Sequence, residues 1–331
     1  MNAQEQREAI LEGVSAAASL HERLSLRERL ADGRAPVDVF EILNHLGVPT
    51  LCRPLDRLLG AFLPDPLFGI VVTTRRDLHV QRYTAAHELG HYLLDHSARL
   101  DDEGSVGFLA RGEMHRDPRE VAADSFASEL LAPRWLVTAT VDRQEWTASQ
   151  LREPGIVYQL SLRLGISYVA ACWCLASHQA LERSEATELA KIPPKVSKQE
   201  ALGGMELDNP WADVWTLTDR DAGLVLVGSP DDVVRIQLTE HGAAGSTWDV
   251  APLVRSGLEL LADEQTILDG DSIGGNGARS LKFRGEGAGR FRLEERRQWD
   301  ESSPVVASFE IEFSLSGKEV GMPRSMRRRL H

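Results

Sequence analysis

Apolar residues recur at helical spacing through most of the first half of the chain. Over residues 3–31, Ile10, Val14, Ala17 and Leu20 lie three or four positions apart, which predicts a helix with one buried face. The same spacing predicts further helices over about 37–46, 83–96 and 118–131, and two or three segments within 147–183. A β-branched run over residues 69–74 predicts a short strand among these helices.

Beyond Trp211 the pattern changes to short apolar runs, several of them separated by glycine-rich turns. These runs predict strands over about 213–217, 223–227, 233–238, 280–283, 289–295 and 305–313. A series of short strands is typical of an all-β sandwich or barrel. Between the two patterns, residues 191–198 are charged and contain two prolines, which suits a linker.

The predicted class is therefore α+β, with a helix-rich domain followed by an all-β domain. The predicted boundaries are 1–190 for the helical domain, 191–208 for a linker, 209–318 for the β domain and 319–331 for a basic tail. A chain of 331 residues is long enough for two domains that each bury a core. The arginine-rich stretch 324–329 is interpreted as a solvated, disordered end.

Composition narrows the functional classes. A formal net charge of −13 argues against direct nucleic-acid binding, because binding to polyphosphate needs a basic surface. The early glutamates and the lack of a long apolar run argue against a secretory signal or a membrane span. Three cysteines, Cys52, Cys172 and Cys174, are too few for a disulfide framework, so we expect a cytoplasmic protein.

The candidate chemistry lies in the predicted helix over 83–96. His87, Glu88 and His91 form the pattern H-E-x-x-H. Four residues are just over one helical turn, so both imidazoles project from one face. They can then reach one Zn²⁺ at about 2.0–2.1 Å. Glu88 follows the first histidine, where it can reach a water molecule beside the metal.

A catalytic zinc site usually has three protein ligands, and the candidate for the third is Glu120. Its position near the start of the helix over 118–131 has another explanation, because a glutamate there also suits a capping box. Asp124, one turn on, is either a rival ligand or a hydrogen-bond partner of a metal-binding histidine. His96 and His115 are reserve ligands, although a surface position suits them better.

The stretch from about residue 40 to 180 resembles the ImmA/IrrE family of bacterial metallopeptidases. The resemblance rests on the strand 69–74, the helix with the zinc pentapeptide, and the pattern E-x-x-A-D-x-F-A-x-E-L-L-x-P over 120–133. It implies a zincin-like domain that binds one Zn²⁺ per chain, with Glu120 as the third ligand. It also implies cleavage of a helix-turn-helix repressor in a stress, phage or mobile-element response. Because the chain starts without a convincing DNA-binding domain, we expect any repressor to be a separate protein.

Residues 213–315 resemble chagasin-like inhibitors of cysteine peptidases, which are immunoglobulin-like sandwiches. Three loop stretches carry this resemblance: 242–248, 274–277 and 296–299. The first lacks the family's Asn-Pro-Thr-Thr run, and Gln298 replaces the usual proline before Trp299, so the resemblance implies the fold more than the inhibition. The domain is interpreted as a binding or regulatory module, or as a scaffold. Candidate partner-binding residues are Gly245, Trp248, Gly275, Gly277, Arg297 and Trp299.

These expectations define a mechanism. Glu88 acts as the general base, and zinc polarises the peptide carbonyl. Tyr83 and His115 are candidates for a second oxyanion donor. The strand 69–74 either takes up substrate by edge pairing or is an ordinary sheet strand.

Two alternatives stay open. In the first, the chain is a non-enzymatic regulator with a structural zinc, for which Cys52 supplies a fourth ligand and residues 164–167 mark a DNA- or protein-reading unit. In the second, the chain is a peptidase inhibitor that acts through its β domain.

Overall fold

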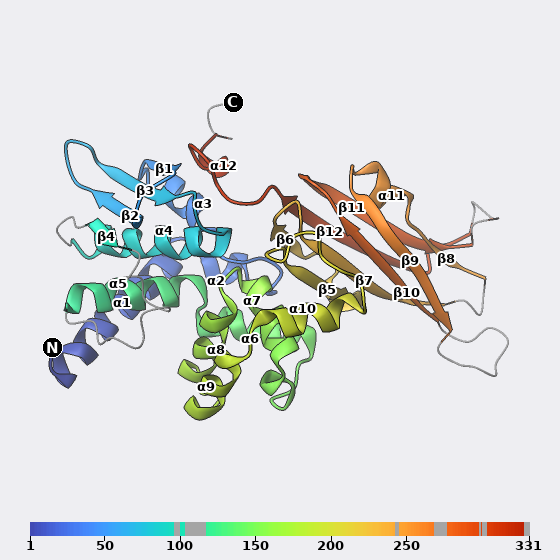
Figure 1. The fold of residues 1–331 in the computed structure, drawn as a ribbon, viewed down its shortest axis with the longest axis horizontal. Coiled ribbons are helices and arrows are strands. Elements are labelled where there is room, and N and C mark those ends of the chain that lie inside the picture. Colours follow the sequence, from blue (N-terminus) through green and yellow to red (C-terminus); the bar gives the residue numbers. More distant parts are fainter. Residues whose placement is uncertain are drawn as a thin grey trace.

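The computed structural model describes residues 1–95, 100–102, 117–241, 245–267, 277–297, 299 and 303–327. Helices and a small sheet occupy one end of the long axis, and two larger sheets occupy the other (Figure 1). The α+β class is thus confirmed, with the helix-rich region first and the β region second.

The first helices follow local sequence signals. The helices are α1 (Ala3–Arg23), α2 (Leu26–Arg29), α3 (Val39–His45), α4 (Leu78–Leu93), α5 (Pro118–Leu131), α6 (Arg134–Gln144), α7 (Pro154–Leu164), α8 (Tyr168–Ser177), α9 (Arg183–Lys191) and α10 (Pro194–Leu202). Asn2 caps α1 by accepting from the backbone of Glu5. The helix expected over 3–31 breaks into two because Ser25 has a left-handed conformation, with φ of 49°.

A four-stranded sheet covers one side of α4. Its strands are β1 (Thr50–Arg53), β2 (Leu58–Leu63), β3 (Gly69–Thr73) and β4 (Leu100–Asp102), in the order β1-β3-β2-β4. Strand β3 runs parallel to β1 and antiparallel to β2. Both of its edges are therefore paired, so the prediction that this strand takes up substrate by edge pairing is wrong.

The helices α4 and α5 cross closely at Gly90. A Cβ added to Gly90 would lie 3.0 Å from the ring of Phe126 and 3.2 Å from the Cα of Ala123. Glycine and alanine thus let the two backbones approach where larger side chains would hold them apart.

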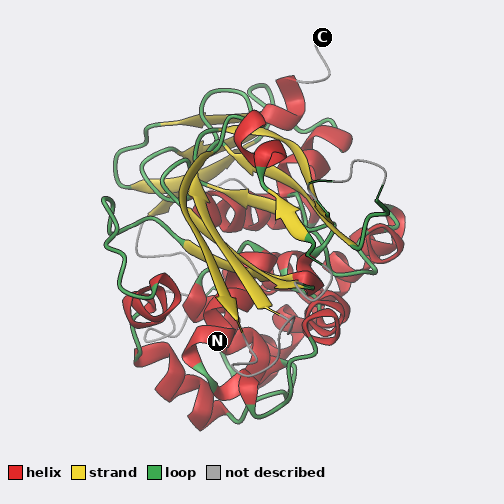
Figure 2. Cartoon of the chain, turned by 90° about the vertical axis from the view of Figure 1, so that its right-hand side faces the viewer, coloured by secondary structure: helices red, strands yellow, loops and turns green. Residues whose placement is uncertain are grey.

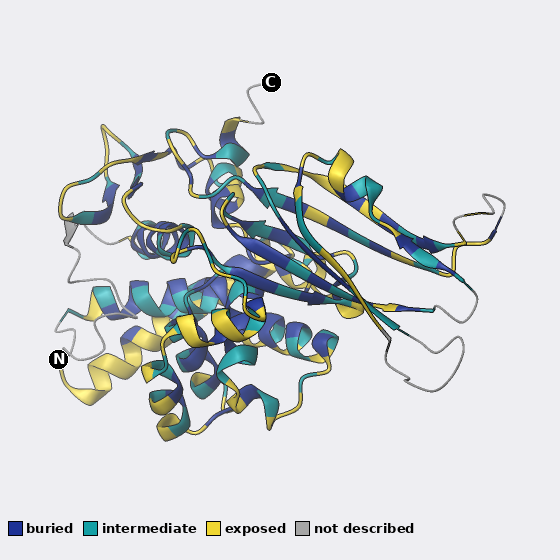
Figure 3. Ribbon diagram, turned by 45° about the vertical axis from the view of Figure 1, so that its right-hand side comes forward, coloured by how far each residue is buried: buried dark blue, intermediate teal, exposed yellow. Residues whose placement is uncertain are grey.

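The second half forms two four-stranded sheets around one core. The strands are β5 (Val214–Thr218), β6 (Val225–Gly228), β7 (Val233–Glu240), β8 (Thr247–Asp249), β9 (Glu259–Ile267), β10 (Gly277–Arg284), β11 (Gly287–Arg296) and β12 (Ala307–Leu315), with helix α11 (Ala251–Arg255) between β8 and β9. One sheet has the order β5-β7-β10-β9 and the other β6-β12-β11-β8. Figure 2 shows the two sheets together, and Figure 3 shows buried and exposed residues alternating along several strands. Trp248, Phe283 and Phe309 are among the largest side chains of this core.

The predicted linker over 191–208 contains an ordered helix. Within it, α10 starts at Pro194, whose fixed φ suits the first helical position. It packs on α7 and β5, and Lys198 forms an ion pair of 3.1 Å with Asp213. The stretch thus bridges the two halves as a helix and not as a flexible linker.

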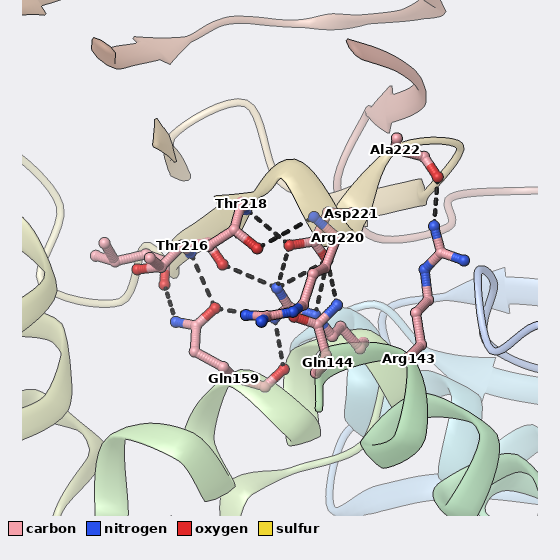
Figure 4. A network of polar contacts seen from close by, with 10 residues as sticks. Arg143, Gln144, Gln159, Thr216, Thr218, Arg220, Asp221 and Ala222 are labelled. Atoms are coloured by element: carbon pink, nitrogen blue, oxygen red, sulfur yellow. Dashed lines mark hydrogen bonds and ion pairs between the residues drawn. The ribbon is translucent and has the colours of Figure 1, made fainter. Parts of the chain in front are cut away.

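A buried polar network joins α7 to the β region (Figure 4). The side chains of Arg163 and Asp221 are only 2% and 0% exposed and form an ion pair at 2.9 Å. Arg163 also donates to the carbonyl of Thr216, and Gln144 donates to Asp221. Gln159 accepts from the backbone of Thr216, so the network ties a helix to a strand end by side chains that water does not reach.

The end of the chain returns to the helical region. We call residues 316–327 the C-terminal strap. Gly321 exchanges two backbone hydrogen bonds of 2.7 Å with Cys52 of β1, and Gln81 of α4 pairs with the backbone of Glu319 in both directions. Met326, in the short helix α12 (Arg324–Arg327), lies in the helical core.

The expectation of a disordered, solvated basic end is therefore wrong for residues up to 327. These packing and pairing contacts hold the strap in place. The remaining residues of the predicted tail lie outside the described part of the chain.

Within the described ranges, no single helix is long and apolar enough to cross a membrane. Among the described residues, α7 and α8 are long and apolar enough only when they are taken together, and they meet at a bend of 97°.

Removal of the arginine from the buried network should destabilise the protein strongly. Arg163→Met leaves Asp221 buried without its counter-charge, so we expect a loss of about 3–5 kcal/mol in the free energy of unfolding, measured by urea denaturation. The control is Lys191→Met, which breaks an exposed pair with Glu188 and should cost less than about 1 kcal/mol. Equal effects of the two substitutions would contradict the assigned role of the network.

Candidate metal centre

Helix α4 carries a run of buried polar residues. All residues from Thr84 to His91 are buried, although three of them, His87, Glu88 and His91, are polar and ionisable. Burial of such groups is costly unless they are hydrogen-bonded, ion-paired or bound to a metal. Their burial on one helix thus needs a partner set, which α5 supplies.

Three ligand-type side chains converge between α4 and α5. The Nε2 atoms of His87 and His91 lie 3.0 Å apart. Glu120 of α5 places its Oε2 3.3 Å from Nε2 of His87 and its Oε1 3.6 Å from Nε2 of His91. One ligand atom from each residue lies within 4.8 Å of the others, so the predicted triad is brought together.

The spacing of these atoms fits a tetrahedral metal ion. Two ligands at about 2.0–2.1 Å from a tetrahedral zinc lie roughly 3.3 Å from one another. The observed distances of 3.0, 3.3 and 3.6 Å bracket that separation. Two imidazoles and a carboxylate are also a ligand set typical of catalytic zinc, so the residues present fit the ion.

The environment of Glu120 favours its ionised form. Burial by itself would raise the pKa of this carboxyl. Hydrogen bonds to His87 and His91, together with the charges of these two residues, outweigh that effect and lower the pKa well below its usual range. An ionised carboxylate is the form that binds a metal.

Asp124 orients the first histidine. Its Oδ1 lies 3.0 Å from Nδ1 of His87 and accepts a hydrogen bond of 2.9 Å from the hydroxyl of Tyr83. A carboxylate at ion-pair distance from Nδ1 favours a proton on that nitrogen and leaves Nε2 free to bind a metal. Of the two roles predicted for Asp124, the geometry favours that of histidine partner.

Tyr83 therefore acts through Asp124 in this structure, since its hydroxyl donates to that carboxylate. Its predicted role as an oxyanion donor stays a prediction. The same holds for His115, which lies outside the described residues together with His96 and Gly275.

Strand β2 approaches Glu88 at a glycine. A Cβ on Gly60 would clash with Thr84 and lie 2.8 Å from Oε1 of Glu88. Only a residue without a side chain lets the strand lie this close to the carboxylate. Sequence reasoning missed Gly60, because a glycine within a strand carries no sign of the partner that it faces.

The candidate partner-binding residues of the β region include both buried and exposed side chains. Trp248 is buried and donates from its ring to the carbonyl of Thr239, so its predicted role as a surface contact is wrong. Trp299 is 73% exposed, and its ring lies against Gly245, where an added Cβ would clash with it. Arg297 is exposed, and Gly277 pairs with Glu240 at the start of β10.

Cys52 is not part of the ligand group. It is buried in the helical core, and burial raises the pKa of its thiol to about 12. Among the described residues, the group that could hold a metal ion consists of His87, His91 and Glu120.

Comparison with known proteins supports both resemblances. Residues 65–175 match the family model of the IrrE N-terminal-like domain, and residues 229–313 match that of the chagasin family of peptidase inhibitors. The chain thus carries an IrrE N-terminal-like domain followed by a chagasin-family domain. No curated protein matched the chain.

Solved structures match the β region. The chain is similar to the cysteine protease inhibitor EhICP2 from Entamoeba histolytica, at 17% identity and a TM-score of 0.28, with 32% of this chain and 99% of that one covered. It is also similar to the solution structure of Amebosin, at 17% identity and a TM-score of 0.22, with 31% and 96% covered.

The role of Asp124 predicts a loss of metal affinity on its removal. Asp124→Ala frees the His87 ring to rotate and to change tautomer, so we expect about 10–100-fold weaker metal binding in a chelator competition. Asp124→Asn keeps an acceptor for Nδ1–H and should lose less. Asp142→Ala removes an exposed carboxylate from α6 and serves as the control; unchanged affinity in Asp124→Ala would refute the role.

Proposed function

We propose that the chain is a zinc-dependent endopeptidase. The observation that carries the proposal is the convergence of His87, His91 and Glu120 at separations suited to zinc, with Glu88 next to the first ligand. The match to the IrrE N-terminal-like domain supports a metallopeptidase-like function independently.

In peptide hydrolysis, each residue of the site would have a separate role. His87, His91 and Glu120 would hold zinc, which supplies Lewis acidity toward a peptide carbonyl and a water molecule. Asp124 would keep His87 in the tautomer that binds through Nε2. Glu88 would take the proton of the attacking water and return it to the leaving amine.

The substrate that we propose is a helix-turn-helix repressor or a similar regulator, encoded as a separate protein. This rests on the resemblance to ImmA/IrrE peptidases, as do the proposed stress, phage or mobile-element response and the cytoplasmic location. We also retain, as a proposal, a division into a zincin-like domain over 1–190 and an immunoglobulin-like domain over 209–318, now with a helix between them and a returning strap.

The role of Glu88 predicts a separation of metal binding from cleavage. Glu88→Gln removes the base and spares the ligands, so the variant should keep its zinc and lose cleavage by roughly 100-fold or more. His87→Ala should lose zinc, as measured by elemental analysis. Cleavage is followed by blot after co-expression with the proposed helix-turn-helix repressor substrate.

Glu188→Gln, on the exposed face of α9, is the matched control and should cleave like the wild type. Cleavage by Glu88→Gln near the wild-type level would reject the base role. Full zinc content in His87→Ala would reject the ligand assignment.

A second candidate function is inhibition of another peptidase by the β region. The match to the chagasin family over residues 229–313 favours it. The end of the β region that carries β8 lies far along the molecule from α4 and α5 (Figure 1), so a peptidase held there would be a separate protein.

The hypothesis of peptidase inhibition predicts that the exposed Trp299 contributes to binding of the inhibited peptidase. Full-length protein should inhibit a papain-type cysteine peptidase, and Trp299→Ala should weaken the inhibition about tenfold or more. Glu88→Gln should inhibit as well as the wild type, because its substitution is at the metal centre. Lack of inhibition by the wild type would remove this candidate.

A further inference from the structure

A cavity of about 310 Å³ lies where the two halves of the chain meet, apart from the metal centre. Its walls come from α2 and α3, the first turns of α4, strands β6 and β12, and the C-terminal strap. This volume is at the lower end of the range for small-molecule sites. The cavity is therefore large enough for a compact organic molecule.

Arg82, on α4, lines this cavity and is only 5% exposed. Its Nη2 donates to the carbonyl of Val37 at 2.6 Å, whereas its Nε has no hydrogen-bond partner within the described part of the chain. Gly165 packs against the guanidinium, where an added Cβ would lie 2.7 Å from Cζ. Neighbours thus fix the group in place without neutralising it.

No carboxylate among the described residues lies within ion-pair distance of Arg82. Asp38 is close enough to act on its charge, but burial is the larger effect and lowers the pKa of Arg82. Moreover, Asp38 accepts hydrogen bonds from the backbone at the start of α3. A buried cation without a counter-ion is costly, so an anion that bound beside Arg82 would gain from neutralising its charge.

The other arginines of the cavity wall already have ion-pair partners. Arg29 pairs with Glu41 at 3.0 Å, and Arg324 pairs with Glu319 at 2.8 Å. The remaining carboxylate, Glu312, lies 3.5 Å from Arg290. Arg82 is therefore the arginine of the wall that can bind an anion without breaking an existing ion pair.

Two further features define the chemistry of the cavity wall. Ser325 of the strap also lines the cavity, and its buried Oγ lacks a hydrogen-bond partner among the described residues. Apolar side chains, including Leu26, Leu78, Val225 and Val227, cover other parts of the wall. The wall therefore suits a molecule with one anionic end and an apolar body.

We propose that this cavity binds a small organic carboxylate, with its charged end on Arg82 and its apolar body against β6 and α2. The bound molecule lies between both halves of the chain and the strap, so its binding stabilises their association.

The test uses hexanoate as the probe and the full-length protein. Hexanoate should raise the melting temperature of the wild type in a saturable manner and give a dissociation constant by calorimetry. Hexanamide has the same shape without the charge and should bind at least about tenfold more weakly. Equal binding of the amide, or no binding of hexanoate at millimolar concentration, would overturn the proposal.

Three substitutions test the location of the site. Arg82→Met should weaken hexanoate binding about 10–100-fold, the loss expected for a charge-assisted hydrogen bond. Arg29→Met removes a paired arginine from the same wall and should have little effect. Val227→Phe fills the cavity from the β side and should abolish binding even if Arg82→Met does not fold; full binding by Val227→Phe would contradict the location.

Discussion

The candidate active site depends on one close contact, the crossing of α4 and α5 at Gly90. With Ala123 and Phe126 against this glycine, the two helices are near enough for Glu120 to reach the imidazoles of His87 and His91. A Cβ at position 90 would push the axes apart, and the carboxylate would move away with α5. Packing of small residues at a helix crossing thus sets the geometry of the metal centre.

The second half of the chain supports the same helix from elsewhere. The strap pairs with Gln81, six residues before His87, and adds to the edge of β1. The pair of Arg163 and Asp221 fastens α7 to the β region. Loss of the strap contact to Gln81, or of one member of the Arg163–Asp221 pair, would leave a buried polar atom without its partner. These contacts therefore fix how the two halves associate more specifically than apolar contact alone would.

The sequence could predict the parts of the site that are local. His87, Glu88 and His91 lie within five residues of one helix, so their spacing alone defines a shared face. Glu120 was a candidate from its position on a predicted helix, and the family resemblance favoured it further. Its distance from α4 could not be predicted, because that distance depends on the crossing at Gly90. The choice of Asp124 as a histidine partner and the approach of Gly60 to Glu88 are tertiary contacts with no local signal.

In the fold, too, elements with a local sequence signal could be predicted, and elements that depend on tertiary contacts could not. The buried strands β7 and β12 were predicted from their apolar pattern, whereas β9 was missed because its sequence is rich in charged and polar residues and it lies at a sheet edge. The helix α10 was not predicted, because the two prolines in residues 191–198 suited a linker, whereas Pro194 in fact starts the helix. The docking of the strap could not be foreseen, because a run of arginines around one methionine is typical of a solvated end.

The most direct test of the account is X-ray absorption spectroscopy of the protein loaded with one equivalent of zinc. The account predicts a first shell of nitrogen and oxygen atoms only, at about 2.0–2.1 Å, with the outer-shell scattering of two imidazoles and one position left to solvent. A sulfur scatterer at about 2.3 Å, or scattering from three or more imidazoles, would contradict it.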